Sequence, residues 1–193
     1  MKENLIKIAV GLMLINACAT APKKPWWVEK RLNKPEILEG LGYACGLKDK
    51  KALRDAAIND AIQKLILSTS IEVNGYIETR LFSQRDLDVP KSTGGELLDN
   101  VNKTIYNTVL ERKYFEEFYD ARTGEYWVYV WIPQSTVSKI SAQQTIQALE
   151  KATTASDKMK KIREDLEKDL KEYQEKENKE LENIKSTIPK TEN

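Results

Sequence analysis

The amino-acid sequence predicts an α+β fold: a small, mainly antiparallel sheet with helices on one face, followed by a long charged C-terminal helix. Three observations lead to this expectation. Two stretches rich in β-branched and aromatic residues, 108–119 and 125–132, flank a short turn. An alanine-rich stretch with helical spacing follows an earlier strand-like segment. From about residue 135, apolar residues recur at helical spacing almost to the end of the chain.

The first strand is expected at residues 37–45, where Gly40 and Gly42 fall on one face by alternation. Two glycines on one face indicate that another element approaches the sheet closely there. A helix should follow from about Asp49, a plausible N-cap, to Ser68. Its small residues suit a helix that lies close on a sheet; they are Ala52, Ala56, Ala57 and Ala61.

The middle of the chain completes the predicted sheet. Residues 71–82 alternate between apolar and polar and are expected to form a second strand, and residues 83–95 a loop. A short helix is expected at 96–106. The stretches 108–119 and 125–132 then form a hairpin, with Gly124 supplying a positive φ in the turn. The predicted order is β-α-β-(α)-β-β-α.

The C-terminal part is expected to be helical over residues 135–185. A continuous helix of that length would have ~50 residues and extend ~75 Å. Its second half is mostly Lys and Glu with a narrow apolar stripe, which is typical of a weak coiled coil or a solvated helix. Residues 186–193 are expected to be a disordered tail. The α+β domain itself is expected to cover residues 26–134.

The N-terminus has the pattern of an export signal. Lys2 and Lys7 flank the start of an apolar run, residues 8–15, which is too short to span a bilayer as a helix. The run ends in Ile15-Asn16-Ala17-Cys18, which resembles the lipobox of bacterial lipoproteins, although Asn16 is not the usual small residue. The pattern predicts a signal peptide at 1–17, lipidation of Cys18 and a tether at 18–25.

Composition argues against several classes of function. The mature chain, without residues 1–17, has a formal net charge of 0, so no nucleic-acid partner is expected. The chain contains no histidine, and so lacks the residue that most often serves as a general base or a zinc ligand. Glu116 and Glu117 are adjacent on a strand and should point to opposite faces, and Asp86 and Asp88 lack the other ligands of a calcium loop. We therefore expect no catalytic site, metal or cofactor.

The second hairpin strand is apolar on both faces. Trp127, Tyr129 and Trp131 alternate with residues that would enter the core. Their face must meet a covering helix, a protein partner or a small ligand, because large exposed apolar patches mark contact sites. The three side chains are therefore candidates for partner contact.

Three further side chains have two interpretations each. Trp26 and Trp27 could anchor in the membrane interface, or one of them could pack against the sheet and hold the tether. Cys45 could be a buried small hydrophobe, or a free thiol able to cross-link two chains.

Several segments together resemble a known family. They are Pro25-Trp26-Trp27-Val28, Gly40-Leu41-Gly42-Tyr43-Ala44, the alanine-rich helix, a strand ending near Glu78, and the hairpin turn from Asp120 to Tyr126. Their order over about 25–133 is similar to that in the small membrane-associated lipoproteins typified by a Helicobacter surface lipoprotein, to which a flagellar basal-disk lipoprotein is related. The resemblance implies an outer-membrane or surface location, no established catalytic site, and in some members ring assembly or a role in motility.

Taken together, the sequence predicts a non-catalytic, lipid-anchored envelope protein with a structural or assembly role. Its expected partners are the membrane, through the lipid on Cys18, and another protein or a second copy of the chain. Ala19 after the cysteine favours the outer membrane, as the lipoprotein resemblance implies, without indicating which side the domain faces. The alternative is a binding module for a cell-wall glycan or a host ligand, using the hairpin aromatics.

Overall fold

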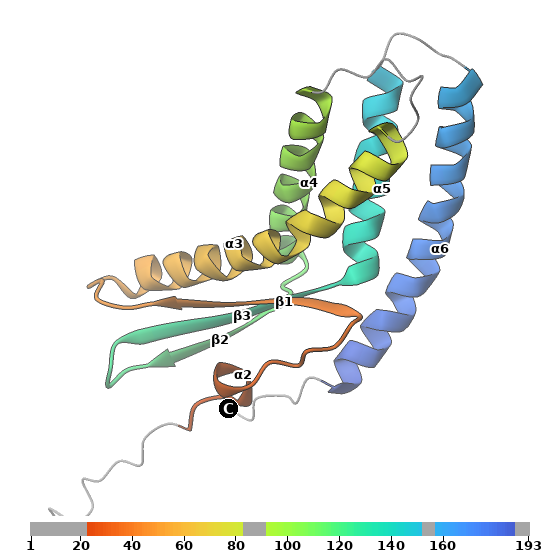
Figure 1. Ribbon diagram of the computed structural model, residues 1–193. Helices are drawn as coiled ribbons and strands as arrows, with labels where there is room; N and C mark the ends of the chain where they lie inside the picture. The colour runs from red at the N-terminus through yellow and green to blue at the C-terminus, as the bar shows by residue number, and fades with distance from the viewer. Residues whose placement is uncertain (1–22, 83–91, 152–156, 188–193) are drawn as a thin grey trace, which may run out of the picture.

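The computed structural model describes residues 23–82, 92–151 and 157–187, and it confirms the predicted α+β class (Figure 1). The described residues form an antiparallel sheet in the order β1-β3-β2, with β3 in the centre. The strands are β1 (Ile37–Ala44), β2 (Phe115–Asp120) and β3 (Glu125–Pro133). The helices are α2 (Trp26–Glu29), α3 (Lys50–Ile77), α4 (Ser92–Glu111), α5 (Gln134–Lys151) and α6 (Asp157–Thr187), and a π-helical turn, η1 (Glu78–Phe82), continues α3.

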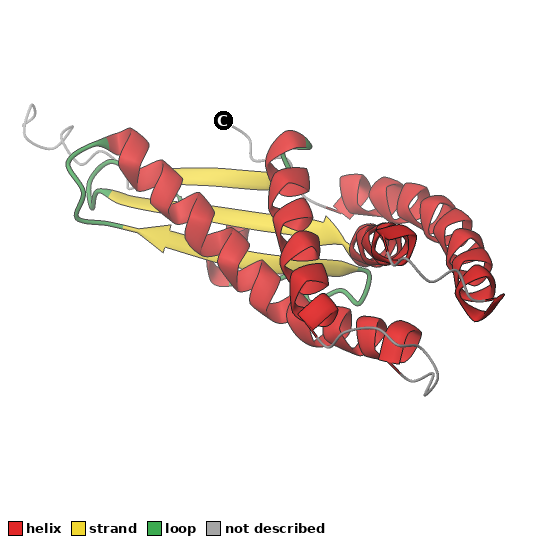
Figure 2. Cartoon of the chain, turned by 90° about the horizontal axis from the view of Figure 1, so that it is seen from above, coloured by secondary structure: helices red, strands yellow, loops and turns green. Residues whose placement is uncertain are grey.

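The first half of α3 lies directly on the sheet (Figure 2). A Cβ atom on Gly42 would be 2.0 Å from the Ala57 carbonyl oxygen, and one on Gly40 would be 2.3 Å from the Ala61 carbonyl oxygen. Ala57 and Ala61 are fully buried. The predicted close approach at the two glycines is thus confirmed.

The start of α3 and the hairpin turn also have the local structure that the sequence predicts. The Asp49 carboxylate accepts hydrogen bonds from the backbone N–H groups of Lys51 and Ala52, at 3.1 and 3.3 Å, and so caps α3. Gly124 has a φ of +67°, and its N–H donates to the Asp120 carbonyl at 2.8 Å. The predicted cap and turn are both confirmed.

The strand predicted at 71–82 is wrong, because α3 continues through it. Val73 and Ile77 are buried and four residues apart, whereas Ile71 is 81% exposed and a Cβ on Gly75 would meet open space. The buried residues Val73, Ile77 and Leu81 fit both a two-residue and a four-residue repeat, whereas the exposed Ile71 fits only the four-residue repeat of a helix. Burial against neighbouring helices thus overrides the β-propensity of this segment.

The C-terminal region is also different from the prediction. The expected single helix over 135–185 is two helices, α5 and α6, which lie side by side in Figures 1 and 2. Together with α4 and the second half of α3, they form a helical layer beyond one end of the sheet. The apolar stripe of α6 is therefore covered by its own chain; it includes Met159, Ile162, Leu166 and Leu170.

The first hairpin strand is shorter than predicted. Residues 108–111 belong to α4, with Val109 fully buried, and β2 begins only at Phe115. The helix predicted at 96–106 is present within the longer α4. The loop predicted at 83–95 is wrong over residues 92–95, which form the start of α4. Other predictions fall outside the described residues: the signal peptide, Cys18 and most of its tether, and the part of the loop with Asp86 and Asp88. The tail predicted at 186–193 begins inside α6, and residues beyond Thr187 are not described.

We predict opposite effects for two glycine-to-alanine substitutions. Gly42→Ala places a methyl group against the backbone of α3 and should lower the free energy of unfolding by ~1–3 kcal/mol. Gly75→Ala adds a methyl group in open space inside a helix and should raise it by ~0.5–1 kcal/mol. Urea denaturation of both variants measures this, and a stable Gly42→Ala protein would contradict the close contact between helix and sheet.

Candidate functional site

The face of the sheet opposite α3 is the aromatic face, formed around Trp127, Tyr129 and Trp131 of β3. In the register of the sheet, Val128 lies across from Gly42 and Val130 across from Gly40, on the side that α3 covers. The three aromatic residues alternate with these valines and therefore point to the other side. The predicted division of β3 into a core face and a second apolar face is confirmed.

The aromatic face is covered mainly by the short helix α2. Trp27 is 1% exposed and stacks on Tyr129, with ring centroids 6.0 Å apart and planes at 21°. Trp26 meets the same tyrosine edge-on, also at 6.0 Å. Tyr129 itself is 1% exposed, so it is a core residue in this chain and not an open contact site. The interpretation in which a tryptophan packs on the sheet is confirmed for Trp27.

Hydrogen bonds hold the segment after α2 to the same face. The Tyr129 hydroxyl donates to the Glu39 carboxylate at 2.6 Å, and the same carboxylate accepts from the backbone N–H groups of Leu32 and Asn33. Burial raises the pKa of Tyr129, and the hydrogen bond to Glu39 raises it further. The phenol therefore stays protonated and acts as a structural donor.

Trp127 and Trp131 are half-buried and keep some exposed surface. The Trp127 ring lies 4.5 Å from that of Tyr43, and the Lys24 ammonium is 5.2 Å from its centroid. Trp131 stacks on Tyr114 at 4.5 Å. Of the three predicted contact residues, these two remain available for a partner.

The carboxylates of β2 are used for structure. Glu116 and Glu117 lie in successive positions of the sheet register, so they point to opposite faces as predicted. The Glu117 carboxylate accepts two hydrogen bonds from Arg54, both at 2.7 Å, and one from the Tyr126 hydroxyl at 2.6 Å. Burial alone would raise the pKa of Glu117, but these donors outweigh it and lower the pKa. The pKa of Tyr126 shifts in the opposite direction, because burial and the hydrogen bond to the Glu117 carboxylate raise it to about 12.

Two buried carboxylates attach α6 to the first turn of α5. Glu180 accepts hydrogen bonds from the Ser135 backbone N–H at 3.1 Å and from the Ser135 hydroxyl at 2.5 Å. Glu177 accepts from the Thr136 hydroxyl at 2.8 Å and forms ion pairs with Lys139 and Arg112. Both carboxylates are 4% exposed. Both lie at the N-terminus of α5, where the helix dipole places partial positive charge. Their negative charges, which come from α6, therefore stabilise α5.

The sequence did not identify Glu177 and Glu180, because a Lys/Glu-rich helix is usually solvated. It also missed two exposed apolar side chains on α3: Leu67 is 69% exposed and Ile71, one turn later, is 81% exposed. Ile71 had been assigned to a strand. The prediction that Cys45 is buried is wrong, since it lies just after β1 ends and is exposed. Its other interpretation, a free thiol, stands.

An open groove of about 680 Å³ lies between α3, α5 and α6. Tyr76, Arg80 and Tyr173 line it together with Gln134 and Ser141. The Arg80 guanidinium is already paired with Asp169, at 2.5 Å. Among the described residues, no group of three or more potential metal-ligating side chains is present. These features alone do not define a reaction.

Comparison with protein-family models and with curated proteins finds no match to this chain. The lipoprotein resemblance therefore stays a prediction. Within the described part of the chain, no helix combines the length and apolarity that a membrane span requires.

We predict that acid and the substitution Glu177→Gln both loosen α6. Because the pKa of Glu177 is lowered in the folded protein, its stabilisation is complete above its ordinary value of 4.5 and is lost as the pH falls through the folded value. Glu177→Gln removes both ion pairs and should cost ~1–3 kcal/mol, a range that allows for solvent screening at the partly exposed Arg112.

Hydrogen exchange of α6 amides as a function of pH measures this effect. Glu182→Gln, at an exposed position of the same helix, is the matched control and should change stability by less than ~0.5 kcal/mol. Equal behaviour of the two variants would show that the buried carboxylate does not attach α6.

Proposed function

We propose that this protein is a non-catalytic lipoprotein of the bacterial envelope, held at the outer membrane by lipid on Cys18 and acting as a structural or assembly component. The observation that supports this most directly is the lipobox-like sequence Ile15-Asn16-Ala17-Cys18. Its cysteine lies only seven positions before Pro25, the residue that precedes α2. A diacylated and further acylated cysteine provides two or more chains, which is enough for stable anchoring.

The way the chain enters the fold supports a structural role. Trp27, nine residues after Cys18, is buried and stacked on Tyr129 of the central strand β3. A force applied at the lipid would therefore be transmitted to the central strand through a core side chain. A flexible tether attached only at the surface would not require a buried tryptophan at this position.

The exposed pair Leu67 and Ile71 supports contact with another protein. Neighbouring residues one helical turn apart form a continuous apolar surface, and such surfaces often mark protein contacts. The pair lies on α3, on a different part of the molecule from the aromatic face. A second copy of the chain or another envelope protein would cover it.

The alternative is a glycan- or host-ligand-binding module. Trp127 and Trp131 remain half-exposed and could stack on a sugar ring, whereas Tyr129 is engaged by Trp27. A pull-down on purified cell wall with Trp127→Ala and Trp131→Ala separates this alternative from the assembly role.

We predict that Cys18→Ser abolishes anchoring. In cells given labelled palmitate, the wild-type chain should take up label and remain with the outer membrane after carbonate washing. The Cys18→Ser chain should take up no label and become extractable, because the thiol that accepts lipid is gone. Cys45→Ser is the control and should behave as wild type. Label on the Cys18→Ser chain would overturn the assigned anchor.

We predict that Leu67→Ser with Ile71→Ser disrupts assembly without unfolding the protein. Both side chains are largely exposed, so the free energy of unfolding should change by less than ~0.5 kcal/mol per site. In-cell cross-linking should give a discrete larger species with wild type and lose it with the double variant. Gln174→Ser with Asn178→Ser, at two exposed positions one turn apart on α6, is the control. An unchanged cross-linking pattern would remove this pair from the contact surface.

A further inference from the structure

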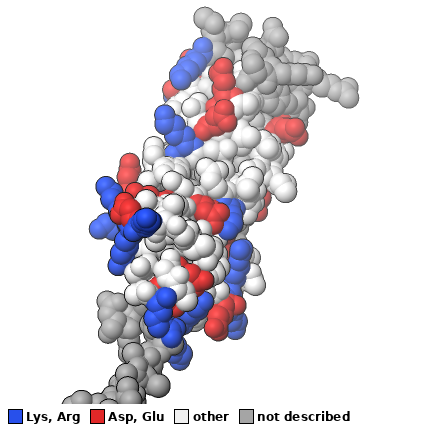
Figure 3. Space-filling view, turned by 90° about the vertical axis from the view of Figure 1, so that its left-hand side faces the viewer, with Lys and Arg blue, Asp and Glu red and all other residues white. Residues whose placement is uncertain are grey.

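One end of the sheet carries a concentration of positive charge, which we call the basic tip. It comprises residues 23–24, the β1–α3 loop at 45–51 and the hairpin turn at 120–125. Six cations lie in these three segments against three carboxylates, although the whole chain has a net charge of only +1. Figure 3 views the molecule from this end and shows Lys and Arg side chains over its lower half, with some Asp and Glu among them. The cations are Lys23, Lys24, Lys48, Lys50, Lys51 and Arg122.

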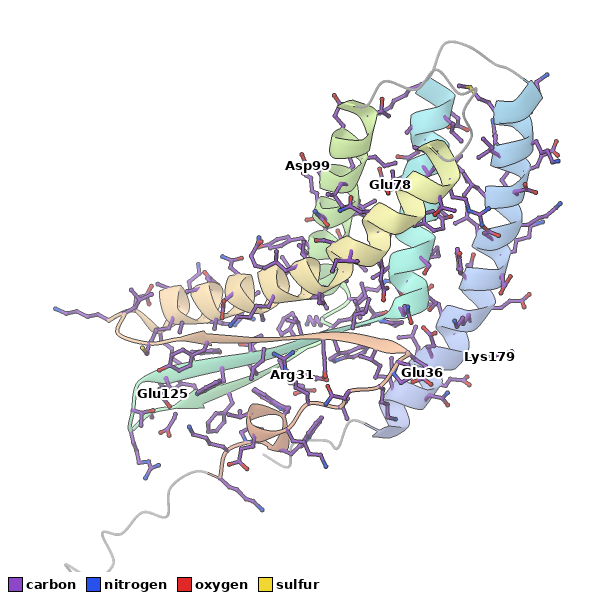
Figure 4. The ribbon with its side chains drawn as sticks, viewed as in Figure 1. Arg31, Glu36, Glu78, Asp99, Glu125 and Lys179 are labelled. Carbon is purple, nitrogen blue, oxygen red and sulfur yellow. The ribbon has the colours of Figure 1, made fainter. Side chains whose placement is uncertain are left out.

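Direct contacts bring the three segments together. In the sheet register the last residue of β1, Ala44, pairs with Tyr126 at the start of β3. The Lys50 ammonium lies 4.4 Å from the centroid of the Tyr119 ring, next to the hairpin turn. Lys24 lies 3.6 Å from Glu125, which marks this end of the sheet in Figure 4. The basic tip is therefore a single surface.

The three carboxylates of the basic tip are engaged with the protein, whereas the lysines are exposed. Asp49 caps α3, and Asp120 is 1% exposed and accepts a hydrogen bond from the Arg122 N–H at 3.0 Å. Glu125 accepts a hydrogen bond from the Tyr43 hydroxyl and pairs with Lys24. Lys24 and Arg122 are in turn paired with Glu125 and Asp120, so the outward positive charge comes mainly from the exposed Lys23, Lys48, Lys50 and Lys51.

Leu47 adds an apolar side chain at the outer edge of the same surface. It is 49% exposed and lies in the β1–α3 loop, immediately before Lys48. An exposed leucine beside several lysines is the combination that suits the boundary between lipid headgroups and acyl chains.

The lysines of this loop conflict with the helix that they begin. Lys50 and Lys51 are the first residues of α3, and its first turn contains no acidic residue. The N-terminus of a helix carries partial positive charge and favours carboxylates, so these lysines weaken α3. A residue type that is unfavourable for the local structure often marks a functional position.

We propose that the basic tip rests on anionic lipid headgroups of the membrane that holds Cys18. This inference rests on the proposed anchor and specifies the surface that the anchored domain turns to the bilayer. Six residues lie between Cys18 and Pro25, so the domain stays within ~25 Å of its lipid even if that stretch is fully extended. The described chain begins at Lys23, within the basic tip, so a short tether brings this end of the sheet to the bilayer.

The contact of the tip with lipid is weak, electrostatic and dependent on the anchor. Each lysine near an anionic surface strengthens binding about fivefold, and salt screens the interaction. Lipid chains alone give membrane residence without orientation. The tip orients the domain, and the helical layer of α4, α5 and α6 at the other end of the sheet then projects away from the bilayer (Figure 1).

The test uses the mature chain, residues 18–193, with Cys18→Ser, which leaves Cys45 as the single cysteine, exposed within the basic tip. An environment-sensitive fluorophore on Cys45 reports contact with vesicles. We expect a blue shift with vesicles that contain about 30% phosphatidylglycerol, none with neutral phosphatidylcholine, and loss of the shift between ~0.05 and ~0.5 M NaCl. The same fluorophore on Gln147→Cys in a cysteine-free background, on α5 at the far end, should show no shift.

Charge reversal separates lipid contact from folding. Lys48→Glu, Lys50→Glu and Lys51→Glu together should lower vesicle affinity at least ~100-fold, while Tm stays at or above the wild-type value, because acidic residues suit the start of α3. Lys161→Glu, Lys168→Glu and Lys171→Glu on α6 change the net charge equally and should retain binding. The glutamine triple at positions 48, 50 and 51 serves if the glutamate variant does not fold.

Three outcomes would overturn the proposal: equal binding to neutral and anionic vesicles, equal loss in the α6 control, or retained binding in the tip variants. The proposed function fails separately, if wild-type Cys18 takes up no palmitate. Vesicle binding by the tip is measured without the lipid, so each result stands independently.

Discussion

The close approach of α3 to β1 is the constraint on which the rest of the structure depends. Gly40 and Gly42 leave no room for side chains between strand and helix, and Ala57 and Ala61 keep the helix surface equally flat. Because α3 lies so near, its polar side chains reach the outer edge of β1. Asp60 accepts from the Tyr43 N–H at 3.0 Å, and Lys64 donates to the Leu41 carbonyl at 3.1 Å. These bonds occupy edge groups that could otherwise pair with another strand.

That constraint also determines what the opposite face must be. On the α3 side β1 contributes Gly40 and Gly42, whereas the other face carries Trp127, Tyr129 and Trp131 of β3, which need a cover of their own. The chain covers it with α2, whose Trp27 closes over Tyr129. The residues that complete the core are therefore those that follow the expected lipidation site. A change at Trp27 would therefore disturb the core directly next to the proposed anchor.

The sequence predicted the features that depend on local chemistry: the paired glycines of β1, the Asp49 cap and the turn ending at Gly124. It failed where two periods coincide, since Val73 and Ile77 fit a strand as well as a helix, and only the neighbouring helices decide between them. It also failed for α6, because Lys and Glu composition does not reveal that Glu177 and Glu180 point inward. Nothing local marks a carboxylate whose partners lie some forty residues earlier in the chain.

The two unusual charge arrangements of this molecule differ in a way that bears on function. Glu177 and Glu180 place negative charge at the first turn of α5, where the helix favours it. They accept hydrogen bonds from one backbone N–H, that of Ser135, and from four side chains: Ser135, Thr136, Lys139 and Arg112. They act entirely within the protein. Lys50 and Lys51 place positive charge at the first turn of α3, where the helix opposes it, and they are exposed. A charge that agrees with its helix is explained by folding, whereas folding does not explain one that opposes its helix. For a chain with the proposed lipid anchor, the membrane surface would supply the nearest counter-charge to these lysines outside the fold.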